Sequence, residues 1–298
     1  MGLETLLIFG AIAGAVYALL ALGFTLIYGV AKVVNMAHGT LFMLGAYMFF
    51  VFGPFGYFKL DPIPALILSA ITIGIMGSII YLIFIHPVIE DELAAIVSTV
   101  CAAMIIQQII FVDPPLGFGG EHKGVPALVS GATEILGVTV SNSKLLALTV
   151  SVALFIVVSV FIAKTKTGRA MRAVSQDREV SMLMGVNTTR LYILTIAVAS
   201  ALAAIAGVLI TGSTSPVAEP HMWLTPLFMS FAIVILGGLG SVKGSFIGGF
   251  IVGYAGETVV YLAPEGIFLK GAVALAVMVA VLLIRPKGLF GKRVELED

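Results

Sequence analysis

Polar residues that could act on a solute are few in this chain, and the densest group interrupts a long apolar run. The stretch YGVAKVVNMAHGTLFMLGAY contains Asn35, His38 and Gly39 within otherwise apolar surroundings. Asn or His can cap a helix and Gly relaxes the restriction on φ, so the three predict a helix break. Two interpretations follow: a short turn joining two spans, or a discontinuous helix whose ends face a solute pathway.

A second interruption is rich in glycine. The stretch GGLGSVKGSFIGGFIVGYAGE contains Gly244, Gly248, Gly249 and Gly253, which form two pairs at a spacing of four residues. This spacing lets helix backbones approach closely, so helix packing is the first interpretation and contact with a ligand the second. Both interruptions are followed by a glycine-containing span that ends near a tyrosine, which is a trace of an internal repeat.

One acidic residue falls inside an apolar segment. Glu257 lies within IVGYAGETVVYL, and Lys270 is the nearest basic residue beyond that segment. A charge near the centre of a bilayer costs about 3 kcal/mol, so Glu257 should face the bundle interior or a wet cavity, unless its span is shifted toward the outer interface. A pathway role and a structural role both fit. The predicted pathway residues are Asn35, His38, Gly39, Gly45 and Glu257.

Motifs of enzymes and cofactor sites are missing from the sequence. It contains no GxxxxGK[ST] phosphate loop, no HExxH and no GxSxG, its four histidines are scattered, and Cys101 is its only cysteine. The net charge is zero, so the chain has no excess of basic residues with which to attract nucleic acid. We therefore predict no catalytic residue, no metal site, no cofactor and no nucleic-acid partner.

The elements that position these residues must lie in a membrane. Of the 298 residues, 60% are hydrophobic and only 11% are charged, whereas soluble domains carry about 25% charged residues. The predicted fold is an all-α, polytopic inner-membrane helical bundle, a single domain over residues 1–298. Candidate spans are 5–30, 40–58, 63–85, 93–112, 145–163, 191–211, 225–240, 245–262 and 269–284. The seventh is short, so eight or nine crossings are both open.

Basic residues predict the orientation, because Lys and Arg concentrate in short cytoplasmic loops. Ten of the sixteen lie in two places: Lys164, Lys166, Arg169, Arg172, Arg178 and Arg190 in one loop, and Arg285, Lys287, Lys292 and Arg293 near the C-terminus. Both places should be cytoplasmic, and nine spans then put the N-terminus outside. MGLETLLIFG is expected to open the first span rather than to form a cleaved signal peptide.

The basic loop over residues 164–190 should contain a helix from Gly168 to Met184. A solvated, positive-inside loop explains its arginines but not the apolar Val180, Met182 and Leu183. A cytoplasmic helix with those residues needs a surface to pack on, either the membrane face or a partner.

Several motifs resemble a known family. Glu179-Val-Ser-x-x-x-Gly185 resembles the EAA-x-x-x-G loop of ABC importer permeases, with Val180 and Ser181 in place of the two alanines. GAVYALLALGFTLIYGVAKVVNMAHGTLFMLGAY, GGLGSVKGSFIGG and LLIRPKGLFGK resemble the branched-chain amino-acid ABC transporter permease family of LivH type. The resemblance covers essentially the whole chain; the acidic loop HPVIEDE departs from it, since basic residues are expected there.

This resemblance implies a permease subunit of an ATP-driven importer for branched-chain or related amino acids, in a bacterial or archaeal cytoplasmic membrane. Its implied partners are a second homologous permease, two cytoplasmic ABC ATPase subunits, an extracytoplasmic solute-binding protein and membrane lipid. Family members also serve other amino acids, urea or short amides. The implied ATPase contacts are Arg169, Arg172, Asp177, Glu179 and Gly185.

Two other classes of protein fit the composition. A self-sufficient channel or ion-coupled carrier would use Glu257 and His38 as its ion or proton residues, and its uptake would not depend on ATP. A structural subunit of a larger complex would transport nothing.

Overall fold

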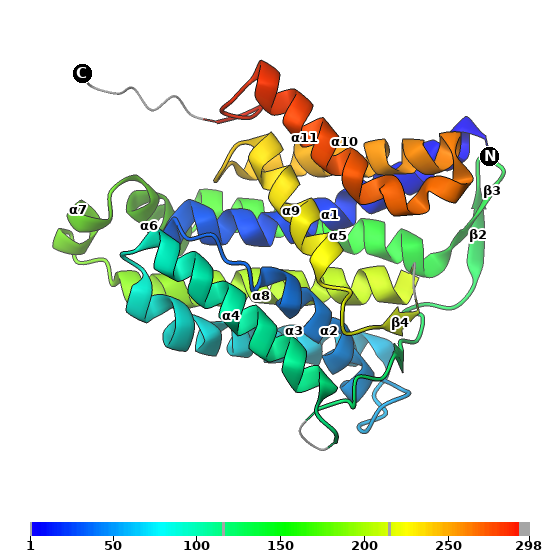
Figure 1. Cartoon of the computed structure of the whole chain (residues 1–298), viewed down its shortest axis with the longest axis horizontal. Coiled ribbons are helices and arrows are strands. Elements are labelled where there is room, and N and C mark those ends of the chain that lie inside the picture. The colour runs from blue at the N-terminus through cyan, green and yellow to red at the C-terminus, as the bar shows by residue number, and fades with distance from the viewer. Residues whose placement is uncertain (1, 115–116, 214–215, 292–298) are drawn as a thin grey trace.

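The computed structural model describes residues 2–114, 117–213 and 216–291 (Figure 1). Its helices are α1 (Leu3–Ala31), α2 (His38–Phe52), α3 (Pro62–Ile80), α4 (Glu92–Phe111), α5 (Asn142–Lys164), α6 (Lys166–Gln176), α7 (Arg178–Leu183), α8 (Thr188–Ser213), α9 (Leu224–Gly237), α10 (Val242–Leu262) and α11 (Lys270–Ile284). A π-turn (Tyr81–Ile85) and a 3₁₀ turn (His86–Val88) extend α3, and a 3₁₀ segment (Pro264–Leu269) precedes α11. The all-α helical bundle is confirmed.

In the part of the chain that the structure describes, nine apolar helices occupy the nine candidate spans. In the described residues, six segments are long and apolar enough to cross a membrane: α1, α3 with its extension, α4, α5, α8 and α10. The other three, α2, α9 and α11, are shorter, with 15, 14 and 15 residues. A 15-residue helix is about 22 Å long, less than the roughly 30 Å of a hydrocarbon core. The bundle therefore contains partial spans as well as full ones.

Two small antiparallel sheets were not predicted from the sequence. Strand β1 (Lys123–Gly124) pairs with β4 (Val217–Ala218), and β2 (Ala132–Ile135) forms a hairpin with β3 (Val138–Ser141). They lie at the end of the bundle that also holds the N-terminus (Figure 1). Their strands are two to four residues long, too short for a periodic sequence signal.

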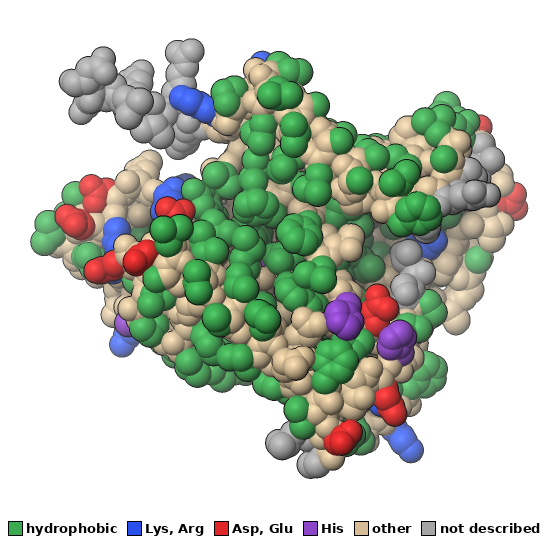
Figure 2. All heavy atoms as spheres, in the orientation of Figure 1, with side chains coloured by type: hydrophobic (Ala, Val, Ile, Leu, Met, Phe, Trp, Pro, Cys, Tyr) green, Lys and Arg blue, Asp and Glu red, His purple; other side chains and the backbone are tan. Residues whose placement is uncertain are grey.

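The two ends of the bundle differ in what they carry. Helices α6 and α7 and the end of α11 lie at the end opposite the N-terminus and the hairpin (Figure 1). Figure 2 shows hydrophobic side chains across the middle of one face, with many of the visible charged side chains toward its ends. The basic loop and the residues after α11 thus share one end, as the charge pattern predicted; Lys292 and Arg293 lie outside the described residues.

The predicted helix from Gly168 to Met184 is wrong in one respect, because two helices occupy this range. Helix α6 ends at Gln176, and Asp177 adopts an extended conformation. The Oδ1 atom of Asp177 accepts a hydrogen bond from the backbone N–H of Val180 at 2.9 Å. This cap starts α7 and competes with continuation of α6.

Candidate solute pathway and coupling surface

The chain turns back into the bundle after α1. Helix α1 ends as Lys32 takes a left-handed conformation with φ 56°. The His38 Nε2–H group, at the start of α2, then donates a hydrogen bond to the Leu20 carbonyl at 3.1 Å. Because Leu20 lies eleven residues before the end of α1 at Ala31, the chain has returned by about 16 Å along that helix. The segment over residues 32–37 therefore runs back into the bundle before α2 begins. This is the discontinuous geometry, a non-helical half followed by a helical half, rather than a surface turn.

Helix α9 begins at the same level as α2. A Cβ atom on Gly39 would lie 2.7 Å from Leu227 Cβ and 2.7 Å from the Trp223 carbonyl oxygen, so backbone there comes very close to the start of α9. One turn farther on, Phe231 packs against Phe24 of α1 with ring centroids 5.8 Å apart. The two short helices begin side by side in the interior.

From that shared level the two short helices run toward opposite ends. Just beyond α9, Gly240 lies against Gly29 near the end of α1, so α9 follows α1 toward α6 and α7. In the other direction, the Tyr47 hydroxyl of α2 donates to the Glu121 carbonyl at 3.3 Å, beside the strands. Two helix N-termini thus meet at the middle of the bundle. We call this place the half-helix junction, defined by Asn35, His38, Gly39 and Trp223.

Two polar side chains at the junction are almost fully buried. Asn35 is 2% exposed and His38 is 0% exposed. The Asn35 Oδ1 atom accepts a hydrogen bond from the Ala37 N–H at 3.0 Å, which fixes the turn just before α2. Since a carbonyl can only accept, His38 Nε2 carries a hydrogen, and Nδ1 of the neutral ring is an acceptor.

Each of these side chains has a further polar atom to offer. Among the described residues, Asn35 Nδ2, a donor, and His38 Nδ1, an acceptor, have no hydrogen-bond partner. The first turns of two helices add a partial positive charge and free N–H groups. Half-helix N-termini at this depth suit the anionic group of a solute. The junction thus has the chemistry for a small polar or zwitterionic solute.

The remaining predicted pathway residues lie elsewhere. A Cβ atom on Gly45 would lie 2.6 Å from the Ala204 carbonyl oxygen, so Gly45 sits in the contact between α2 and α8. Glu257 Oε1 accepts a hydrogen bond from Lys270 Nζ at 2.6 Å, and both side chains are less than a third exposed. This ion pair joins α10 to the start of α11. The structure therefore brings Asn35, His38 and Gly39 together but not Gly45 or Glu257.

The four predicted packing glycines lie on two faces of α10. Gly249 and Gly253 face α1, where a Cβ on Gly249 would lie 2.6 Å from Ala18 Cβ. Gly244 and Gly248 face α9, where a Cβ on Gly248 would lie 2.9 Å from the Ile233 carbonyl oxygen. Each face thus presents backbone to a neighbouring helix.

The five residues with implied ATPase contacts are exposed on or next to α6 and α7: Arg169, Arg172, Asp177, Glu179 and Gly185. Gly185 follows α7 with φ +85°, a left-handed conformation that favours glycine, and has open space around it. Arg172 donates to the Ile162 carbonyl of α5, which holds α6 against the bundle.

The implied ATPase contacts did not include the most exposed part of this surface, although the sequence predicted that Leu183 packs on the membrane face or on a partner. Leu183 is 87% exposed and Met184 is 80% exposed at the end of α7. Next to them, Arg178 lies 3.8 Å from Glu90 in the loop before α4, an exposed ion pair that links the two loops. The short seventh candidate span, 225–240, was the sequence signal for the partial span α9. The place of Trp223 and Leu227 at the junction was missed, because nothing in the apolar sequence there distinguishes them.

Discontinuous spans whose half-helix N-termini meet inside an apolar bundle, with buried polar groups at the junction, are the architecture of a multi-pass membrane transport protein. The comparison with known families agrees. The chain belongs to the family described as the permease component of branched-chain amino acid transport systems, whose model matches residues 6–282.

Curated relatives cover nearly the whole chain. The chain is 30% identical to the high-affinity branched-chain amino acid transport system permease protein BraD of Pseudomonas aeruginosa, over 96% of this chain and 95% of BraD. It is also 30% identical to the corresponding permease LivH of Escherichia coli, over 95% and 94% of the two chains. A probable LivH of Methanocaldococcus jannaschii is 28% identical over 92% and 88%. This protein is thus a transport permease subunit, and its role is not enzymatic.

Proposed function

We propose that this protein is one of two permease subunits of an ATP-driven importer that takes up branched-chain or related amino acids. A second homologous permease completes the membrane part, two cytoplasmic ATPase subunits supply the energy, and an extracytoplasmic binding protein delivers the solute. The chain itself has no phosphate-binding loop, so the energy must come from another subunit.

The observation that carries this proposal is the surface of α6 and α7. It projects from one end of the bundle (Figure 1) and presents Leu183 and Met184 almost fully exposed. Apolar side chains outside the hydrocarbon region need a cover, and a protein surface provides one. Asp177 and Glu179 beside them add polar contacts. We propose that this surface docks into the ATPase subunit.

The orientation follows from the same surface. If α6 and α7 meet a cytoplasmic ATPase, the end with the N-terminus and the strands faces outward and meets the binding protein. The distribution of Lys and Arg supports the same orientation.

The solute crosses at the half-helix junction in this proposal. Outward access reaches it beside α2 and inward access beside α9, because these helices extend from the junction toward opposite ends. The α-carboxylate of an amino acid suits the two helix N-termini and Asn35 Nδ2, and its ammonium group suits the acceptor His38 Nδ1. The choice of a branched-chain solute rests on the relatives.

An ion-coupled carrier is less well supported by the arrangement of charges. Its first candidate residue, Glu257, is paired with Lys270 at 2.6 Å. A paired carboxylate at a helix contact has a structural explanation that needs no coupling ion.

Reconstitution tests the proposal. The permease with its partner permease and ATPases, placed in liposomes with ATP inside, should take up labelled L-leucine supplied with the binding protein. Uptake should stop when the enclosed ATP is replaced by a non-hydrolysable analogue. Uptake by the permease alone that follows a pH or potential gradient would refute the proposal and favour the carrier.

A further inference from the structure

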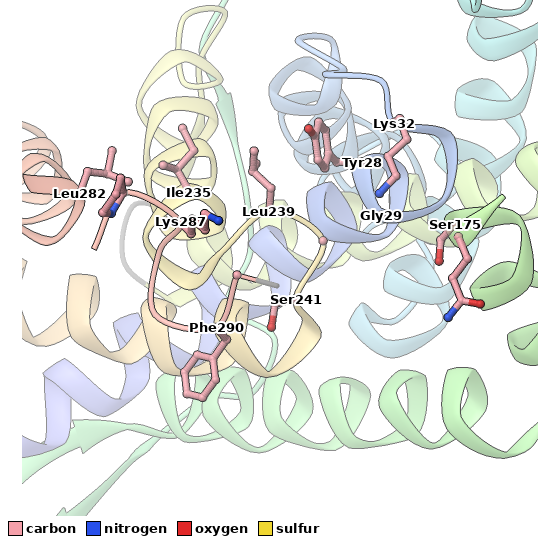
Figure 3. Close-up of a pocket in the computed structure, with 14 residues that line it drawn as sticks. Tyr28, Gly29, Lys32, Ser175, Ile235, Leu239, Ser241, Leu282, Lys287 and Phe290 are labelled. Atoms are coloured by element: carbon pink, nitrogen blue, oxygen red, sulfur yellow. The ribbon is translucent and has the colours of Figure 1, made fainter. Parts of the chain in front are cut away.

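A cavity of about 590 Å³ opens at the end of the bundle that carries α6 and α7 (Figure 3). Four parts of the chain line it: the end of α1 with Lys32, the end of α6, the turn between α9 and α10, and residues 286–291 after α11. Its volume lies in the range of about 300–1,000 Å³ usual for small-molecule sites. No residue of the half-helix junction lines it, so it is a second site.

Two lysines give this pocket its charge. Figure 3 shows the side chains of Lys32 and Lys287 directed toward the space between α1 and the segment after α11. The residues that line the pocket, all in the described part of the chain, include no Asp or Glu. Within that part, neither lysine forms an ion pair. Two ammonium groups without a counter-ion favour a ligand that carries a carboxylate or a phosphate.

Helix ends supply the opposite partial charge. Helices α1, α6 and α9 all end next to the pocket, and the C-terminal end of a helix is partially negative. Gly29 lines the pocket, and the residue that would bond its carbonyl within a helix, Val33, lies beyond the end of α1. Lysines near helix ends also stabilise those helices, but that role needs no cavity between them. The pocket offers groups for both an anion and a cation.

Apolar side chains form a large part of the rest of the wall, which Tyr28 and Ser241 also line. Ile235, Leu239, Leu282 and Phe290 line the pocket on the side away from α6. These residues can bury an aliphatic side chain, which favours binding. An inorganic anion or a sugar phosphate has no aliphatic group to bury against them.

Helix α9 connects the pocket to the half-helix junction. Ile235 is in the last turns of α9, and Leu239 follows its end. Helix α9 begins at the half-helix junction, so the pocket lies at the far end of the same half-helix. A solute that leaves the junction along α9 toward this end of the bundle arrives at the pocket.

We propose that this pocket is a release site for a zwitterionic amino acid with an aliphatic side chain, on the cytoplasmic side of the transporter. The carboxylate pairs with Lys32 and Lys287, the ammonium group meets carbonyls at the end of α1, and the side chain packs on Ile235 and Leu239. This inference rests on the proposed importer function.

An amino acid bound in this pocket should slow the transport cycle. Ser175 and Gln176 of α6 form one wall of the pocket, and α6 belongs to the surface proposed to follow the ATPase. A bound amino acid ties α6 to α1 and to the residues after α11. High internal amino acid therefore slows transport by holding α6 in place.

The experiment measures this inhibition in liposomes that contain the complete transporter. ATP and unlabelled L-leucine are enclosed, and the initial uptake of labelled L-leucine with binding protein outside is followed. Internal L-leucine should slow uptake, and Lys32→Gln and Lys287→Gln should each raise the half-inhibiting concentration about three- to tenfold, because each removes one charge-assisted hydrogen bond. Lys32→Arg should retain the inhibition, which separates lost charge from misfolding.

Matched controls define what overturns the proposal. Lys243→Gln removes an exposed lysine at the same end that does not line the pocket, so its inhibition should equal that of the unsubstituted transporter. Internal L-leucinamide, without a carboxylate, and 4-methylpentanoate, without an ammonium group, should inhibit more weakly than L-leucine.

Other outcomes refute the release site. Unchanged inhibition in both pocket variants would do so, as would an equal loss in Lys243→Gln. Inhibition that depends on the fraction of anionic lipid instead of internal L-leucine would assign the pocket to a lipid headgroup. Uptake that needs no ATP is a different failure, since it removes the importer function and leaves the pocket's affinity for L-leucine to be measured directly.

Discussion

Truncation of the exposed tip of α7 is the most direct test of the coupling surface. The change is Leu183→Ala combined with Met184→Ala, residues that are 87% and 80% exposed. Burial of a whole Leu or Met side chain contributes about 1.5–3 kcal/mol. Complete burial of the exposed parts of these two side chains would therefore contribute about 2.5–5 kcal/mol to binding. Alanine keeps its methyl group, and an interface rarely covers a side chain fully. We expect a loss of about 2–3 kcal/mol, or about 30- to 200-fold in ATPase affinity.

The assay is a titration of labelled ATPase subunit onto the permease pair held in lipid nanodiscs. Because both side chains are exposed, the thermal unfolding midpoint of the variant should stay unchanged. Leu136→Ala is the matched control, since Leu136 is 73% exposed on the hairpin at the opposite end. An affinity within twofold of the unsubstituted permease, or an equal loss in the Leu136 variant, would refute docking through α7.

Three further variants test other parts of the structure. Gly249→Leu should lower the thermal unfolding midpoint in detergent, because its Cβ would lie 2.6 Å from Ala18 Cβ and overpacking costs about 1–3 kcal/mol. Glu257→Gln should destabilise by about 1–3 kcal/mol by leaving Lys270 unpaired, and adding Lys270→Met should restore both the midpoint and L-leucine uptake; a stable double variant without uptake would give Glu257 a pathway role. Gly185→Val should strain a φ of +85° and reduce the amount of ATPase that co-purifies, whereas unchanged recovery would exclude a role for this turn.

Much of the fold could be predicted from the sequence because lipid imposes simple rules. Long apolar runs predicted the nine helices, and the Lys and Arg residues predicted which loops share an end. Local hydrogen bonds were harder to predict. The cap made by Asp177 divides the basic segment over residues 164–190 into α6 and α7. The strands near Lys123 and Val217 pair residues that are far apart in the sequence.

The candidate site was predictable only in part, since its two halves come from distant segments. Asn35, His38 and Gly39 stand out because polar residues are rare in an apolar run. Their partner at the junction, the start of α9 at Trp223, has no such contrast in its sequence. Glu257 stood out for the same reason as Asn35, yet its environment is an ion pair with Lys270. A polar residue within an apolar run is easy to recognise in the sequence. The sequence does not show whether that residue has a hydrogen-bond or ion-pair partner in the fold.

The geometry of α9 connects the two ends of the proposed transport cycle. Backbone contacts between Gly29 and Gly240 bring α1 and the end of α9 together without interlocking side chains, so this contact resists sliding less than a packed pair of large residues would. Helix α6 reaches the same place, since Arg172 and Gly29 line one small cavity with Gly240. In the proposed complex, a displacement of α6 by the ATPase would therefore act on the end of α9. Because α9 is only 14 residues long and begins beside Gly39, the displacement extends over one short rigid helix to the junction. This is a shorter mechanical connection than any full span of the bundle provides, and it requires α9 to move as a unit against α1.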